Sequence, residues 1–159
     1  MGKFFATLDQ ELDLYVSQSA WLNAVPDKAE DADPDTKAPD ISRREVLQKK
    51  GVDDLDMPDC EAYYLVSYLF EIGPTVMNGM GEAPITQSDI ADFQTNTGID
   101  LNAWDARSLR RLSMVYLSAS YKAKKPDAPA PWQEASYVLS IPNSKAESSR
   151  NRVRALANL

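Results

Sequence analysis

Apolar side chains recur at helical spacing near the N-terminus of the chain, and acidic residues lie close to the start of the same segment. A helix dipole favours acidic residues at this place. We therefore expect an amphipathic helix in residues 1–25; a detachable partner-binding helix is the alternative interpretation. The apolar positions are Phe4, Phe5, Leu8, Leu12, Tyr15, Val16 and Leu22.

The next segment, residues 26–40, has six acidic residues among alanines and prolines and no large apolar side chain. Such a segment repels itself and has little to bury, so it is typical of a flexible acidic linker. Part of it superficially resembles a calcium-binding loop. Thr36 stands where that loop needs glycine, and Ser42 stands where it needs glutamate, so we expect no calcium site.

Residues 41–124 contain three helix starts with capping signals, in which a side chain at the N-cap and one three residues later satisfy each other's backbone N–H groups. Gly51 and Gly98 follow the first two of these helices, whose ends favour a residue with positive φ. This range is therefore predicted to be the helical core domain. The capping pairs are Ser42 with Glu45, Thr86 with Asp89, and Asn102 with Asp105.

A further helix, predicted at about residues 59–72, is apolar on nearly all sides. Such a helix is either enclosed by its neighbours or faces another protein. Cys60 is expected there as a small buried hydrophobe. Aromatic rings tolerate one hydrated edge, and tyrosine does so best, which makes four residues candidates for a partner-binding surface. These candidates are Tyr63, Tyr64, Tyr68 and Phe70.

The connection at residues 75–84 follows Gly73-Pro74 and contains Gly79-Met-Gly81. A phosphate-binding loop would need a preceding strand and a third glycine that opens a helix. The preceding element is helical and Pro84 occupies the third place, so nucleotide binding is not expected. The glycines are interpreted as positive-φ residues of a tight turn.

The last helix of the core has an apolar stripe formed by Trp104, Leu109, Leu112, Val115, Tyr116 and Ala119. Three arginines lie to the side of the stripe. They form either a solvated basic face that pairs with local acids such as Asp105, or a docking patch for an acidic segment. That segment would be the chain's own linker or part of a partner. The arginines are Arg107, Arg110 and Arg111.

Residues 125–159 begin with a proline-rich run that is expected to be extended and held to the helices by Trp132. Residues 137–141 are a short strand or an extended arm, and Ser144 with Glu147 opens a terminal helix. The predicted fold class is all-α. We expect a small bundle of three to five short helices, with an acidic N-terminal linker and an extended proline-rich C-terminal arm.

Composition restricts the classes of function. The formal net charge of −7 and the pI of about 4.6 argue against binding to nucleic acid or to an anionic membrane. No apolar run approaches the roughly 20 residues that cross a bilayer, and the N-terminus does not resemble a signal peptide. A cytosolic protein is expected.

The residues needed for common catalytic and metal sites are scarce. The chain has one cysteine and no histidine, so a zinc site, an internal disulfide and a histidine proton shuttle are not expected. Glu61 and Glu71 would project to the same side of a helix about 15 Å apart, which is too far for a glycosidase pair. We expect neither an enzyme nor a cofactor.

Several short motifs occur in a fixed order between residues 41 and 132. They are Arg44-Glu-Val-Leu with Gly51, Tyr63 to Gly73 with Phe70-Glu71, Gly79-Met-Gly with Pro84-Ile-Thr, Asp89-Ile90, Gly98 with Leu101, Trp104 with Leu109-Arg-Arg-Leu-Ser-Met-Val-Tyr116, and the run from Pro126 to Trp132. In these motifs the chain resembles the tail assembly chaperones of long-tailed bacteriophages. Residues 1–40 and 137–159 depart most from that pattern.

The resemblance implies a non-catalytic protein of the infected cell's cytoplasm that is absent from the finished virion. It would bind the tape measure protein, keep it soluble and help to bring tail tube subunits to it. A structural virion component, such as a tail or connector adaptor, is the alternative. An acidic inhibitor of a host enzyme is a third interpretation, although it would need its acids ordered on one face. Formation of a homo-oligomer is left open.

Overall fold

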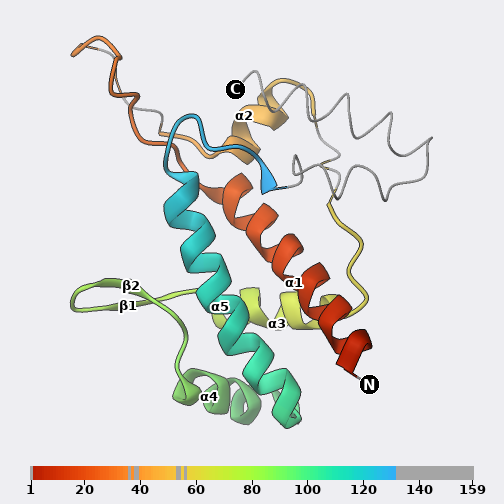
Figure 1. Cartoon of the computed structure of the whole chain (residues 1–159). Coiled ribbons are helices and arrows are strands. Elements are labelled where there is room, and N and C mark those ends of the chain that lie inside the picture. Colours follow the sequence, from red (N-terminus) through yellow and green to blue (C-terminus); the bar gives the residue numbers. More distant parts are fainter. Residues whose placement is uncertain (1, 36, 38–39, 53–54, 56, 132–159) are drawn as a thin grey trace, which may run out of the picture. The chain divides into compact units, whose positions relative to one another are not determined.

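The computed structural model describes residues 2–35, 37, 40–52, 55 and 57–131 of the chain, and Figure 1 shows the order of their elements. The described part is mostly helical, as predicted, and it also contains a two-stranded antiparallel sheet, which was not predicted. The elements are α1 (Gly2–Asn23), α2 (Arg43–Lys49), α3 (Tyr63–Ile72), β1 (Val76–Asn78), β2 (Gly81–Ala83), α4 (Gln87–Thr97) and α5 (Ala103–Ala123).

The chain divides into two compact units. Unit 1 contains Met1–Val16 and Asp59–Ser118, and unit 2 contains Ser17–Pro58 and Ala119–Leu159. Most of α1 and α5 therefore belongs to unit 1, together with α3, the sheet and α4. Unit 2 contains the ends of α1 and α5, all of α2, and the acidic segment, in which the described residues form no helix or strand.

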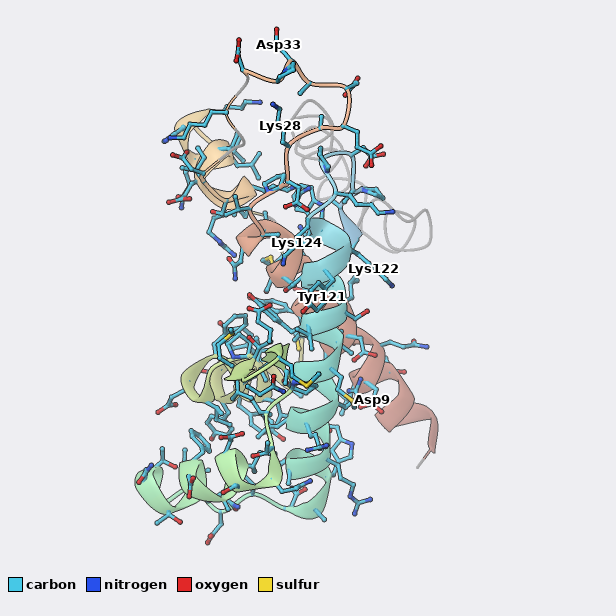
Figure 2. The ribbon with its side chains drawn as sticks, turned by 90° about the vertical axis from the view of Figure 1, so that its left-hand side faces the viewer. Asp9, Lys28, Asp33, Tyr121, Lys122 and Lys124 are labelled. Carbon is cyan, nitrogen blue, oxygen red and sulfur yellow. The ribbon has the colours of Figure 1, made fainter. Side chains whose placement is uncertain are left out.

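Unit 1 has one hydrophobic core to which all four of its helical segments contribute. In both views the axes of α3 and α4 run crosswise to the axis of α5 (Figures 1 and 2). Burial of these apolar side chains is the main force that holds the segments together. The buried members are Leu8, Leu12, Val16, Ala62, Leu65, Val66, Leu69, Ile85, Ile90, Leu109 and Leu112.

The predicted capping boxes are present at the starts of α2 and α4. At α4 the hydroxyl of Thr86 accepts a hydrogen bond from the N–H of Asp89, whose carboxylate accepts one from the N–H of Thr86 at 2.6 Å. Hydrogen bonds from Thr86 also lower the pKa of Asp89. Gly98 ends α4 in the left-handed conformation, as predicted.

The predicted start of α3 is wrong by four residues, because the helix begins at Tyr63 rather than Asp59. The N–H of Glu61 donates instead to the carboxylate of Glu11 on α1, at 3.3 Å. Cys60 therefore precedes the helix, where it is half-buried against the core of unit 1. Burial raises the pKa of its thiol.

Residues 76–83 form a β-hairpin in which Met77 pairs with Glu82 across the two strands. The tight turn was predicted, but the strands were not, and the positive φ predicted for both glycines of the turn is found at Gly81 and not at Gly79. At the turn the side chain of Asn78 accepts a hydrogen bond from the N–H of Met80 at 3.0 Å. Gly81 has a φ of 127°, which strongly favours glycine. The hairpin extends away from the helices of unit 1 (Figure 1).

Both ends of the hairpin are held by one buried serine of α5. The hydroxyl of Ser113 donates to the carbonyl of Pro74 at 2.7 Å and accepts from the N–H of Ile85 at 2.9 Å. Arg110 donates to the carbonyl of Ile85 at 3.3 Å. The hairpin is thus fixed on α5 by polar contacts, although its strands are only three residues long.

Unit 2 is organised around a buried guanidinium group. Arg43 donates to the carbonyl of Ala123, the last residue of α5, and to that of Lys125 just beyond it. Its guanidinium carbon lies 4.7 Å from the ring centroid of Trp21. Burial lowers the pKa of Arg43. The side chain therefore satisfies carbonyls that a helix end leaves unpaired.

The proline-rich run begins with a turn rather than with the predicted extended path, because the N–H of Ala128 donates to the carbonyl of Lys125 at 3.1 Å. The indole N–H of Trp21 holds this turn by donating to the carbonyl of Ala128 at 2.9 Å. Trp132, the predicted strand and the predicted terminal helix lie outside the described residues.

Replacing Arg43 with alanine is expected to lower the free energy of unfolding by about 2 kcal/mol or more, because two carbonyls lose a charged donor. Arg44→Ala is the matched control, since Arg44 donates to the exposed side chain of Asn23 at 3.1 Å. Urea denaturation measures both effects. Equal losses in the two variants would contradict the assigned role of Arg43.

Ser113→Ala is expected to destabilise the chain by roughly 1–3 kcal/mol, because the buried N–H of Ile85 loses its acceptor. Amide exchange of the paired hairpin residues is expected to accelerate as well. Ser118→Ala, at an exposed position on the same helix, is the control. Unchanged exchange in the hairpin of the Ser113 variant would show that the serine does not hold it.

Candidate functional site

Helix α3 is buried along one side and exposes aromatic rings along the other. Leu65, Val66 and Leu69 are enclosed in the core of unit 1. On the opposite side Tyr63 is 51% exposed and Phe70 is 37% exposed. These two rings are seven residues apart, or nearly two helical turns, so they lie on the same side. With Tyr64, they form a surface that we call the α3 face.

Contacts at their edges hold the exposed rings in place. Tyr63 meets Tyr15 of α1 edge to face, with the ring centroids 5.4 Å apart. Phe70 meets Tyr116 of α5 in the same way at 5.6 Å. Each ring is therefore packed on one part and exposed on another, an arrangement that suits a protein contact.

Tyr68 differs from the other three aromatic candidates because it is half-buried and packs against the core of unit 1. Its ring lies 5.3 Å from Phe93 of α4 and 5.7 Å from Tyr64. Tyr68 therefore connects α3 with α4 and packs against one member of the α3 face, Tyr64. Of the four predicted aromatic residues, three are exposed and Tyr68 is half-buried.

Tyr64 is the member of the α3 face with a strong polar contact. Its hydroxyl donates to the carboxylate of Asp105, near the start of α5, at 2.8 Å. Burial raises the pKa of Tyr64 to about 12, and the hydrogen bond and negative charge of Asp105 add to the effect. The bond fixes the direction of the ring, and the phenol stays neutral at physiological pH.

The three predicted arginines lie on α5 and make different contacts. Arg111 forms ion pairs with Asp9, at 2.9 Å, and with Asp13, both on α1. Asp9 lies on the side of α1 that faces α5 (Figure 2). Arg110 bonds the carbonyl of Ile85, and Arg107 is exposed.

The proposed local partner of the arginines, Asp105, is engaged elsewhere. Its carboxylate accepts from Tyr64 and, at 3.3 Å, from the N–H of Asn102 at the start of α5. The predicted pairing of the arginines with Asp105 is therefore not observed, whereas Arg107 and Arg110 are exposed, as a solvated basic face requires. Arg111 joins α5 to α1, and its partners are far away in the sequence.

The sequence interpretation missed two exposed methionines on the hairpin. Met77 is 76% exposed and Met80 is 98% exposed. Flexible, polarisable methionine side chains adapt well to protein surfaces of varied shape. The turn sequence Asn78-Gly-Met-Gly81 was a usable signal, because it favours a tight reversal that leaves the methionine outside.

The described residues contain no group of three acidic or cysteine side chains arranged to hold a metal ion. None of the helices in the described part of the chain combines the length and the apolar character that crossing a membrane requires. Among the described residues of unit 1, the exposed large apolar side chains are those of the α3 face, the two hairpin methionines and Met114 of α5. The chemistry they offer is apolar contact with a few polar groups, which suits binding.

Tyr64 is expected to keep its proton up to a pH of about 12. Its folded pKa is higher than the usual pKa of about 10, so its contribution to stability is present below pH 10 and is lost as the pH rises through 12. Asp105→Asn is expected to lower this pKa, because it removes the negative charge. Titration of tyrosine absorbance near 295 nm measures it, with Tyr64→Phe as the control that removes the late step. A late step that persists in Tyr64→Phe would contradict the assignment.

No family model matches the chain, and neither a curated protein nor a solved structure matches it. Any function assigned to the chain therefore rests on its own exposed residues and contacts.

Proposed function

We propose that this chain is a non-catalytic tail assembly chaperone that binds the tape measure protein of a long-tailed bacteriophage. The observation that supports a binding role is the α3 face, where Tyr63, Tyr64 and Phe70 remain exposed although the opposite side of the helix is fully enclosed. Exposed aromatic clusters of this kind are typical of protein interfaces. The identity of the partner comes from the motifs between residues 41 and 132.

The α3 face suits a helical client because its exposed rings follow the helix axis. A partner helix could pack its apolar stripe along that ridge, as amphipathic helices do in other recognition complexes. A tape measure protein is long and prone to aggregate, so covering its apolar stripe would keep it in solution. Under this proposal the chain acts in the host cytoplasm, also contacts tail tube subunits, and leaves before the virion is complete.

A structural role in the virion is the competing proposal, and particle composition separates the two. Mass spectrometry of purified particles is expected to detect no stoichiometric amount of the chain if it is a chaperone. A fixed copy number in every particle would favour a tail or connector adaptor. The fold does not distinguish between these roles, because both need an exposed protein-binding surface.

Co-expression with the tape measure protein from the same genome is expected to raise the soluble yield of that protein. The double change Tyr63→Ser and Phe70→Ser is expected to remove roughly half or more of the gain, because exposed aromatic residues dominate interface energies. Quantitative immunoblotting of soluble and insoluble fractions measures the effect. Both positions are exposed, so the fold is expected to persist, and circular dichroism checks this.

Tyr121→Ser is the matched control for the co-expression test. Tyr121 is also 51% exposed, but it lies in unit 2 at the end of α5, beside Lys122 and Lys124 (Figure 2). It is expected to leave the soluble yield unchanged. No gain from the wild-type chain, or an equal loss in the Tyr121 variant, would contradict the proposed function.

A further inference from the structure

The negative charge of the chain is concentrated in unit 1. This unit has eleven acidic and four basic residues, which give it a formal charge of −7, whereas unit 2 has thirteen of each. From Gly51 to Ala106 the sequence contains no lysine or arginine. Helix α3, the hairpin and α4 all lie within this span, so none of them has a basic side chain.

Carboxylates accompany the exposed apolar side chains on α3 and the hairpin. Glu71 is exposed and follows Tyr64 by seven residues, so both lie on the same side of α3. On the hairpin, Glu82 is paired directly opposite Met77, and opposite residues of an antiparallel pair project from the same face. The exposed surface of these two elements is therefore apolar and acidic.

Neither carboxylate forms an ion pair with a basic side chain of the described residues, where the ion pairs are Lys37 with Asp40 and Arg111 with Asp9 and Asp13. Arg110 donates to the carbonyl of Ile85 and is in none of these ion pairs. Like charges repel one another, and a partner with lysine or arginine at the edge of its apolar side would relieve that repulsion.

We propose that the α3 face and the hairpin together bind a basic amphipathic helix of the partner. The apolar side of that helix packs on Tyr63, Phe70 and the two hairpin methionines, and its lysines or arginines meet Glu71 and Glu82. This inference rests on the proposed function, because it gives the chemistry of the segment that the chaperone binds.

The same features disfavour other occupants of this surface. Nucleic acids and anionic membranes would be repelled by the carboxylates. A second copy of the chain would bring an equally negative unit 1 against this one. The strands of the hairpin are three residues long, which offers little edge for an added strand, whereas the exposed side of α3 offers a ridge for a helix.

The test uses the full chain and two synthetic peptides of about 20 residues, a length that allows a stable amphipathic helix. Both peptides have leucines at the same helical positions; one has lysine at every polar position, and the other has glutamate. Fluorescence anisotropy is expected to show at least about tenfold tighter binding of the lysine peptide. Added NaCl is expected to weaken that binding, because salt screens the attraction.

Variants separate the proposed site from general attraction to an acidic protein. Glu71→Gln with Glu82→Gln is expected to weaken binding of the lysine peptide about fivefold or more and to reduce its salt dependence. The matched control is Glu30→Gln with Asp31→Asn, which removes two exposed charges from unit 2. Equal weakening in both pairs would overturn the inference, because the attraction would then not be local.

Phe70→Ser with Met80→Ser is also expected to weaken binding of the lysine peptide, because the peptide loses apolar contacts. If the wild-type chain bound both peptides equally and this variant bound neither, the partner would not need to be basic and the inference would be overturned. The proposed role in protein binding would still stand. Failure of both peptides would overturn the inference; the co-expression gain then decides separately whether the proposed function survives. A dimer in sedimentation experiments that is lost in this variant would assign the surface to self-association and would also overturn the inference.

Discussion

The core of unit 1 depends on burying Leu65, Val66 and Leu69 of α3 among side chains of α1, α4 and α5. The helix has apolar side chains on nearly all sides, but the neighbouring helices enclose only one side of it. Once this contact forms, the aromatic residues on the opposite side have no place in the core. Their exposure is therefore a direct consequence of the packing, and it is also the feature that a partner could use.

Polar side chains of α5 position the elements around that core. Ser113 and Arg110 hold the ends of the hairpin, Arg111 joins α5 to α1, and Asp105 orients Tyr64. These bonds explain why a hairpin with three-residue strands can present Met77 and Met80 in a defined place. They also engage two of the three arginines, Arg110 and Arg111, in contacts within unit 1.

Local signals in the sequence predicted local structure well. Capping residues and helix-ending glycines gave the starts and ends of α2 and α4, because those interactions span only a few residues. Contacts between distant residues were not predictable in this way: Arg111 and Asp13 are 98 residues apart, and Trp21 and Ala128 are 107 apart. The sequence predicted that the aromatic residues of α3 form a surface, but it did not predict which of them would be buried. A helix that is apolar all round has no polar side to mark its exposed face.

The absence of basic residues from 51 to 106 was visible in the sequence and would have indicated the charge of the surface.

The central claim is that the α3 face and the hairpin are covered by a partner protein. Hydroxyl-radical footprinting tests it most directly, because aromatic and methionine side chains oxidise readily when they are exposed. The measurement compares the free chain with its complex with the tape measure protein. The account predicts that Tyr63, Phe70, Met77 and Met80 lose reactivity in the complex while Tyr121 keeps it. Unchanged reactivity of these four side chains in a stable complex would contradict the account.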